Sequence, residues 1–156
     1  MAAVNSDQYG SDKKVPAVVS GGALTCLFGS VTLTAAQSAN DTVNLFTMPK
    51  GFTPLFGFLL GDDIDTGTEA YDIDIGTAAD PDAFGNLGVQ TGDAVTGIKP
   101  ETCIWMPLAG TLCTAAPVRL TADTDCILTV IAAANAGGTG TLNVILMGTY
   151  NDPRVL

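Results

Sequence analysis

Acidic side chains fill the middle of the chain, where no basic residue occurs between Lys50 and Lys99. The carboxylates of this window are Asp62, Asp63, Asp65, Glu69, Asp72, Asp74, Asp80, Asp82 and Asp93. Such a stretch suits three kinds of chemistry: calcium binding through oxygen ligands, glycoside hydrolysis by paired carboxylates, or a solvated acidic rim that offers charge to a basic partner. We expect the acidic rim, because the other two lack the residues that would complete them.

The calcium and hydrolase alternatives are both incomplete in this sequence. Asp63-x-Asp65-x-Gly67 has the alternating oxygen ligands that open a calcium loop, but the rest of the EF-hand pattern is missing, including its final glutamate. A sugar-binding cleft needs several aromatic platforms, whereas this chain has one Trp and three Tyr. We therefore expect no metal site, no cofactor and no catalytic residues. A calcium-dependent or carboxylate-driven hydrolase is kept as the enzyme alternative.

The composition excludes further classes of function. The 156 residues include no histidine, which removes Ser-His-Asp and Cys-His catalysis and histidine metal ligands. With 16 acidic against 6 basic residues and a net charge of -10, the chain lacks the basic surface that binds nucleic-acid phosphates. The four cysteines, Cys26, Cys103, Cys113 and Cys126, show no CxxC spacing, so we expect free thiols rather than disulfides or zinc.

The start of the chain does not read as a secretory signal. Lys13 and Lys14 follow a polar opening, and the stretch behind them is broken by Pro16, Gly21 and Gly22. No apolar run is long enough for a membrane helix. We expect a protein that is made in the cytoplasm and does not bind membranes.

Short alternating patterns between glycine-rich and proline-rich loops predict an all-β fold. In residues 71–75 the tyrosine and isoleucines face a core and the aspartates face water. The expected strands are residues 31–34, 43–48, 53–60, 71–75, 103–108, 118–121, 125–133 and 141–150, with the last two forming a hairpin through a turn at 135–139. About eight strands favour a single β-sandwich over residues 23–156, with a jelly-roll topology. Residues 1–22 lack periodicity and are expected to form a flexible, extended N-terminal arm.

The parity of each expected strand also predicts which side chains are buried between two sheets. These are Val31, Leu33, Phe56, Phe58, Ile73, Ile75, Leu128, Val130, Val144 and Leu146.

Two segments carry a resemblance to a known class of proteins: residues 46–52, Phe-Thr-Met-Pro-Lys-Gly-Phe, and residues 71–85, which begin Tyr-Asp-Ile-Asp-Ile-Gly. From about Leu24 to Tyr150 the chain resembles head decoration, or cement, proteins of tailed bacteriophages of the β-sandwich and jelly-roll type. The resemblance implies a non-enzymatic virion protein, made in the host cytoplasm, that binds the outside of an icosahedral capsid. It would bridge neighbouring major capsid subunits and stabilise the shell.

The resemblance also implies how such a protein associates. It implies a homo-oligomer, with a trimer favoured because three-fold sites are common docking points in shells, and a dimer as the alternative. Members often clamp neighbours with terminal arms, so Lys13 and Lys14 are expected to meet acidic groups of a partner. Trp105 is a candidate interface anchor, although a buried core tryptophan is the alternative. The alternative function is a phage head-fibre or tail-associated module that binds host-surface glycans.

Overall fold

The computed structural model describes the backbone of residues 3–5, 24–62, 64–66, 70–87, 103–106 and 118–150, and the side chains of residues 24–62, 64–66, 70–85 and 118–150. Every regular element in these ranges is a β-strand, in agreement with the all-β prediction. The strands are β1 (Ala3–Asn5), β2 (Leu24–Leu33), β3 (Thr42–Met48), β4 (Phe52–Gly61), β5 (Asp72–Gly76), β6 (Gly85–Leu87), β7 (Cys103–Met106), β8 (Thr124–Ala132) and β9 (Gly140–Tyr150).

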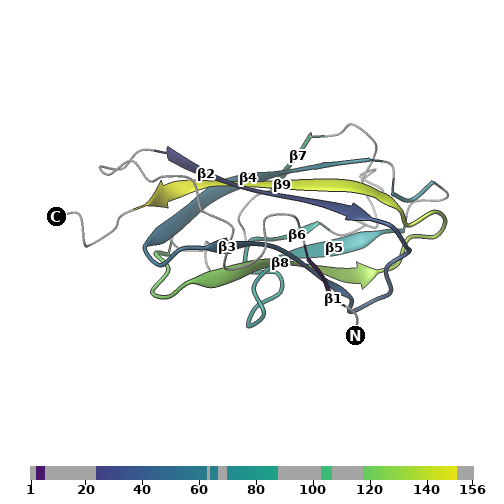
Figure 1. Ribbon diagram of the computed structural model, residues 1–156, viewed down its shortest axis with the longest axis horizontal. Coiled ribbons are helices and arrows are strands. Elements are labelled where there is room, and N and C mark those ends of the chain that lie inside the picture. The colour runs from purple at the N-terminus through teal and green to yellow at the C-terminus, as the bar shows by residue number, and fades with distance from the viewer. Residues whose placement is uncertain are drawn as a thin grey trace.

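The strands form two sheets that lie one above the other (Figure 1). One sheet has five strands in the order β1-β3-β8-β5-β6, and the other has four in the order β2-β9-β4-β7. Neighbouring strands are antiparallel, apart from β1, which runs parallel to β3. The core lies between the two sheets because alternate side chains of each strand point toward the opposite sheet.

Eight of the ten predicted core residues are buried, each less than 4% exposed. They are Val31, Leu33, Ile73, Ile75, Leu128, Val130, Val144 and Leu146. Tyr71, which was also predicted to face the core, is buried as well, whereas the large core side chains Phe52 and Phe84 were not predicted. Period-two alternation therefore located the core correctly in four of the strands, namely β2, β5, β8 and β9.

The prediction for β4 is wrong: Phe56 and Phe58 are half-buried and lie on the outer side of the sheet. The register of β4 with β9 shifts between Pro54 and Phe56, which marks a β-bulge. A bulge adds one residue to a strand, so the inward positions change from even to odd numbers across it. Leu59 is accordingly buried in the core, fully shielded from solvent.

The predicted hairpin between the last two strands is also wrong. β8 and β9 belong to different sheets, so residues 133–139 cross from one sheet to the other. Both edges of β8 are already paired, with β3 and β5, and both edges of β9 are paired with β2 and β4. The turn glycines were nevertheless needed, because Gly137 and Gly138 have φ angles of 84° and 78°.

Two short strands escaped prediction, and one predicted strand is absent. β6 pairs with β5, and β1 pairs with the start of β3 through Val4 and Val43. Residues 3–5 of the expected arm therefore form a sheet strand, while residues 1–2 and 6–23 lie outside the described part. Residues 118–121 are irregular, although Leu120 exchanges backbone hydrogen bonds with Gly51 and Phe52.

Candidate interaction surfaces

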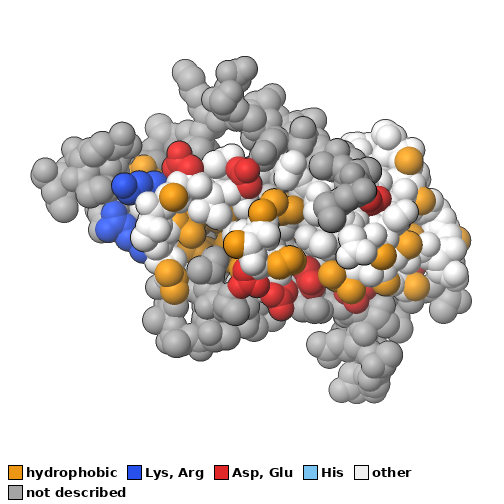
Figure 2. Space-filling view, turned by 90° about the horizontal axis from the view of Figure 1, so that it is seen from below, with side chains coloured by type: hydrophobic (Ala, Val, Ile, Leu, Met, Phe, Trp, Pro, Cys, Tyr) orange, Lys and Arg blue, Asp and Glu red, His pale blue; other side chains and the backbone are white. Residues whose placement is uncertain are grey.

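The outer side of the five-stranded sheet is acidic. Asp72 and Asp74 come from β5 and Asp125 from β8, and the loop between β5 and β6 adds Asp80 and Asp82. Figure 2 looks at this side, where acidic side chains gather between hydrophobic ones and the basic side chains that are drawn lie at one end. Thr47 donates a hydrogen bond of 2.7 Å to the carboxylate of Asp125. We call this side the acidic face.

Asp74 is the most deeply placed carboxylate of the acidic face. The sequence predicted that it faces water, but its side chain is only 7% exposed and its Oδ1 has no hydrogen-bond partner among the described residues. Burial, followed by the negative charges of Asp82 and Asp72, raises the pKa of Asp74 to about 6. Burial also raises the pKa of Asp72. This side of the sheet is rich in acidic residues, as predicted for an acidic rim. Asp74, however, is buried rather than solvated.

The loop between β5 and β6 is tightly folded. Thr77 and Asp80 exchange backbone hydrogen bonds, and Phe84 donates one of 2.9 Å to Ile75 and packs in the core. Gly76 leaves room for the loop, because a Cβ atom there would lie 2.3 Å from the carbonyl oxygen of Asp80. A hydrogen bond with Asp82, more than burial, raises the pKa of Asp80.

Asp65, a candidate calcium ligand, has a structural role instead. It is 2% exposed and accepts four backbone hydrogen bonds. Two donors, Ala70 and Tyr71, lie just before β5. The other two, Asn135 and Ala136, lie in the connection between β8 and β9. Because both carboxylate oxygens already accept N–H groups, Asp65 does not present them to a cation.

The described residues contain no group of three or more His, Cys, Asp and Glu side chains that could hold a metal ion. The same residues include no helix long and apolar enough to cross a membrane. The acidic face therefore has charge but no evident ligand cage within the part of the chain that the structure describes.

The outer side of the four-stranded sheet has the opposite character. Phe28 of β2 and Phe58 of β4 are both paired with Ile145 of β9, so the three form one row across the sheet. Cys26, Met147 and Phe56 form the next row in the same way. We call these six side chains the uncharged face, because none of the residues of β2, β4, β7 or β9 is charged.

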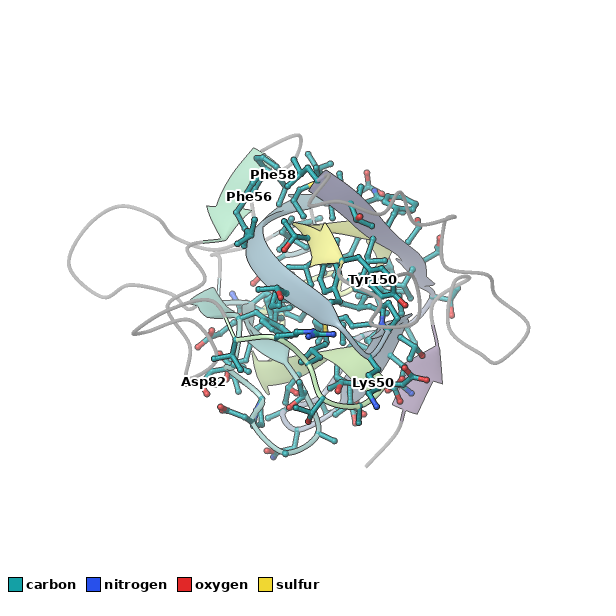
Figure 3. All side chains as sticks on the ribbon, turned by 90° about the vertical axis from the view of Figure 1, so that its left-hand side faces the viewer. Lys50, Phe56, Phe58, Asp82 and Tyr150 are labelled. Atoms are coloured by element: carbon teal, nitrogen blue, oxygen red, sulfur yellow. The ribbon has the colours of Figure 1, made fainter. Side chains whose placement is uncertain are left out.

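The aromatic rings of the uncharged face contact each other. Phe56 and Phe58 meet edge to face, with their ring centroids 6.0 Å apart. Figure 3 shows the two rings together on the outer side, far from the labelled Lys50 and Asp82. Phe28 is 44% exposed and Leu24, at the end of β2, is 52% exposed. Large apolar side chains thus remain accessible on this face.

The predicted partner-binding residues lie mostly beyond what the structure describes. Lys13 and Lys14 are outside the described residues. Trp105 lies in β7 with its backbone in register with Phe58, while its side chain is not among those described. Sequence reasoning missed Cys26, Phe28 and Ile145, although the absence of charge from three long strands was a usable signal.

Two of the four cysteines lie among the described side chains, and both are free thiols as predicted. Cys126 is buried, as expected for a cysteine in an apolar strand, and burial raises its pKa. Cys26 is exposed, because it lies on the outward side of β2. A thiol reagent can therefore label the uncharged face at Cys26.

Solved structures with a similar fold match nearly the whole chain. A chain from the capsid of Ralstonia phage GP4 matches 97% of this chain over 99% of its own length, with a TM-score of 0.71 and 18% identity. A chain from the Cyanophage Pam1 capsid asymmetric unit matches 92% of this chain over 98% of its own, with a TM-score of 0.66 and 18% identity. No protein-family model and no curated protein matches the sequence. At this level of identity the matches establish a shared fold, and the chain therefore has the fold of chains found in two bacteriophage capsids.

Proposed function

We propose that the protein is a non-enzymatic structural component of a bacteriophage virion. In this proposal it binds the outside of an icosahedral capsid and stabilises it by bridging major capsid subunits. The observation that carries the proposal is the match to a chain of the Ralstonia phage GP4 capsid, which covers 97% of this chain and 99% of that one. The resemblance of residues 46–52 and 71–85 to phage head decoration proteins supports the same class.

We also infer that the two sheets form a jelly roll. If β1 is set aside, the order β2-β9-β4-β7 faces the order β3-β8-β5-β6. In both sheets a strand from the end of the chain lies between two earlier ones, as two Greek keys require. Jelly rolls are common among viral capsid proteins, so this topology supports a virion role, although a fold alone does not fix a function.

The hydrogen bonding and burial of two carboxylates favour a structural protein over an enzyme. Asp65 binds backbone N–H groups of two loops, and Asp74 is buried on the outer side of β5. Neither arrangement leaves a carboxylate pair open to a substrate, which an acid–base hydrolase requires.

We propose further that the protein self-associates as a homo-oligomer, with a trimer favoured and a dimer as the alternative. Lys13 and Lys14 would contact acidic groups of a neighbour, and Trp105 would lie in an interface. The protein would be made in the host cytoplasm and reside on the capsid exterior. No contact with nucleic acid or membrane is part of the proposal.

The direct test is cosedimentation of the purified protein with capsids from its own phage that lack it. We expect binding that saturates at a fixed copy number and raises the temperature or chelator concentration at which the shells break open. The paired variant Lys13→Ala/Lys14→Ala should bind more weakly, whereas Lys50→Ala, a change outside the expected arm, should bind like the unmodified protein.

These substitutions are preferable to deletion of residues 2–14, because that deletion removes β1 together with the two lysines. A protein that folds but fails to sediment with the shells would contradict the proposed function. The glycan-binding module would then be the alternative to test, by screening against host-surface glycans.

A further inference from the structure

We infer that a second copy of this chain covers the uncharged face, formed by Cys26, Phe28, Phe56, Phe58, Ile145 and Met147. This inference rests on the self-association part of the proposed function and not on capsid binding. The two apolar rows of this face are in register across β2, β9 and β4, so they form one continuous surface rather than scattered exposed residues.

Charge separates the two outer faces of the molecule. The four-stranded sheet has no charged residue in any strand, whereas the five-stranded sheet carries Asp72, Asp74 and Asp125 within its strands. A chain with a net charge of -10 repels its own copies, and contact through the acidic face would bring carboxylates against carboxylates. The uncharged face lets two copies meet without that cost.

The same face also meets the requirement of self-complementarity. Contact between identical chains requires that the chain itself supply the matching surface. An apolar, charge-free surface is matched by another of its kind, and every copy carries one. Contact through this face therefore joins the copies in pairs, which corresponds to the dimer alternative of the proposed self-association. A capsid subunit can supply basic side chains for the acidic face, but a second copy has 6 basic residues against 16 acidic ones.

The edge of the four-stranded sheet adjoins the uncharged face. β2 is the terminal strand of that sheet and pairs with β9 on one side over ten residues, Leu24 to Leu33. Edge strands of isolated proteins usually carry lysine, proline or a bulge that prevents pairing with another chain. β2 carries no charge, no proline and no register shift. A copy that covers the outer face at Cys26 and Phe28 would lie beside this edge and limit the access of other chains to it.

The test compares two substitutions at residues of equal exposure on opposite faces. Phe28 on the uncharged face is 44% exposed and Ile131 on the outer side of β8 is 43% exposed. Light scattering coupled to gel filtration should give an oligomer for the unmodified protein and for Ile131→Asp, but the mass of one chain for Phe28→Asp. Circular dichroism checks that each variant is folded, and Cys26→Asp serves as the second variant if Phe28→Asp does not fold.

A label on Cys26 provides an independent readout. Maleimide labelling, with the modified peptide identified by mass spectrometry, should be slow in the oligomer and fast in Phe28→Asp. An unmodified protein that is monomeric at all concentrations would overturn both this inference and the proposed self-association. An oligomer that persists in Phe28→Asp and keeps Cys26 reactive would overturn the choice of surface alone, and leave the proposed function standing.

Discussion

The carboxylate of Asp65 lies 3.0 Å from the backbone nitrogen of Asn135, 70 residues later in the chain. The same carboxylate accepts hydrogen bonds from Ala136, Ala70 and Tyr71. It therefore connects the segment before β5 to the connection between β8 and β9. That connection runs from one sheet to the other. The Asp65 side chain therefore helps to fix the position of the connection at this end of the molecule.

Replacing Asp65 by asparagine should lower the free energy of unfolding by about 2–3 kcal/mol. The amide group cannot accept at both ends, so at least one buried N–H loses its acceptor and the remaining bonds lose their charge. Urea denaturation followed by circular dichroism measures the change. Asp62→Asn is the matched control, since Asp62 is exposed and accepts one bond from Thr141, and it should cost less than about 1 kcal/mol. Equal losses in the two variants would contradict the structural role of Asp65.

The stability of the protein should depend on pH through Asp74. Its pKa is raised from 3.8 to about 6 in the folded chain, so folding favours the protonated form. The contribution of protonated Asp74 to folding stability is fully present below pH 3.8, and it is lost as the pH rises through about 6. Asp74→Asn should therefore increase stability at pH 7 by about 1–2 kcal/mol and have little effect near pH 4. Thermal unfolding across this range measures it, and a constant difference between the two proteins would refute the assignment.

Tyr71 should tolerate loss of its hydroxyl group. The side chain is 1% exposed, its hydroxyl has no hydrogen-bond partner among the described residues, and burial raises its pKa to about 12. Tyr71→Phe removes a buried polar group without opening a cavity, so stability should stay unchanged or rise by up to about 1 kcal/mol. Tyr71→Ala should lose about 3–5 kcal/mol, because it empties a core position. Clear destabilisation by Tyr71→Phe in urea titration would mean that the hydroxyl has a partner.

The bulge in β4 makes neighbouring leucines unequal. Leu59 is fully buried while Leu60, the next residue, is half-buried on the outer side. Leu59→Ala should cost about 2–5 kcal/mol, and Leu60→Ala less than half as much. Denaturation midpoints of the two variants measure the contrast. The reverse order would show that β4 continues without a bulge and that Phe56 and Phe58 face the core.

Local patterns predicted the parts of this fold that depend on local physics. Alternation identified β5 and the buried positions of β8 and β9, because period two follows directly from strand geometry. The bulges in β3 and β4 were not predictable, since an extra residue is accommodated by the pairing of neighbouring strands rather than by a local signal. The false hairpin at 135–139 has the same origin: a glycine-rich turn specifies a reversal but not which strand pairs with which.

The candidate site was predictable only as far as composition allows. The acidic window from Asp62 to Asp82 was evident, but the burial of Asp65 and Asp74 depends on tertiary packing, which for Asp65 brings in N–H groups of residues 135 and 136. The uncharged face depends on three strands that are far apart in sequence and become neighbours in the sheet. Recognising it required the pairing of both Phe28 and Phe58 with Ile145.

The central position of β9 has a consequence for biosynthesis. β2 and β4 are not neighbours; each pairs with β9, which spans residues 140–150 of a chain of 156. A ribosome that adds about 5–20 residues per second therefore releases β2 and β4 several seconds before their common partner exists. During that interval the four-stranded sheet cannot assemble, and the apolar side chains of both waiting strands are open to chaperones and to other nascent chains. Folding of this layer is thus completed only after residues 140–150 have been made, and truncation before residue 140 should leave an aggregation-prone product.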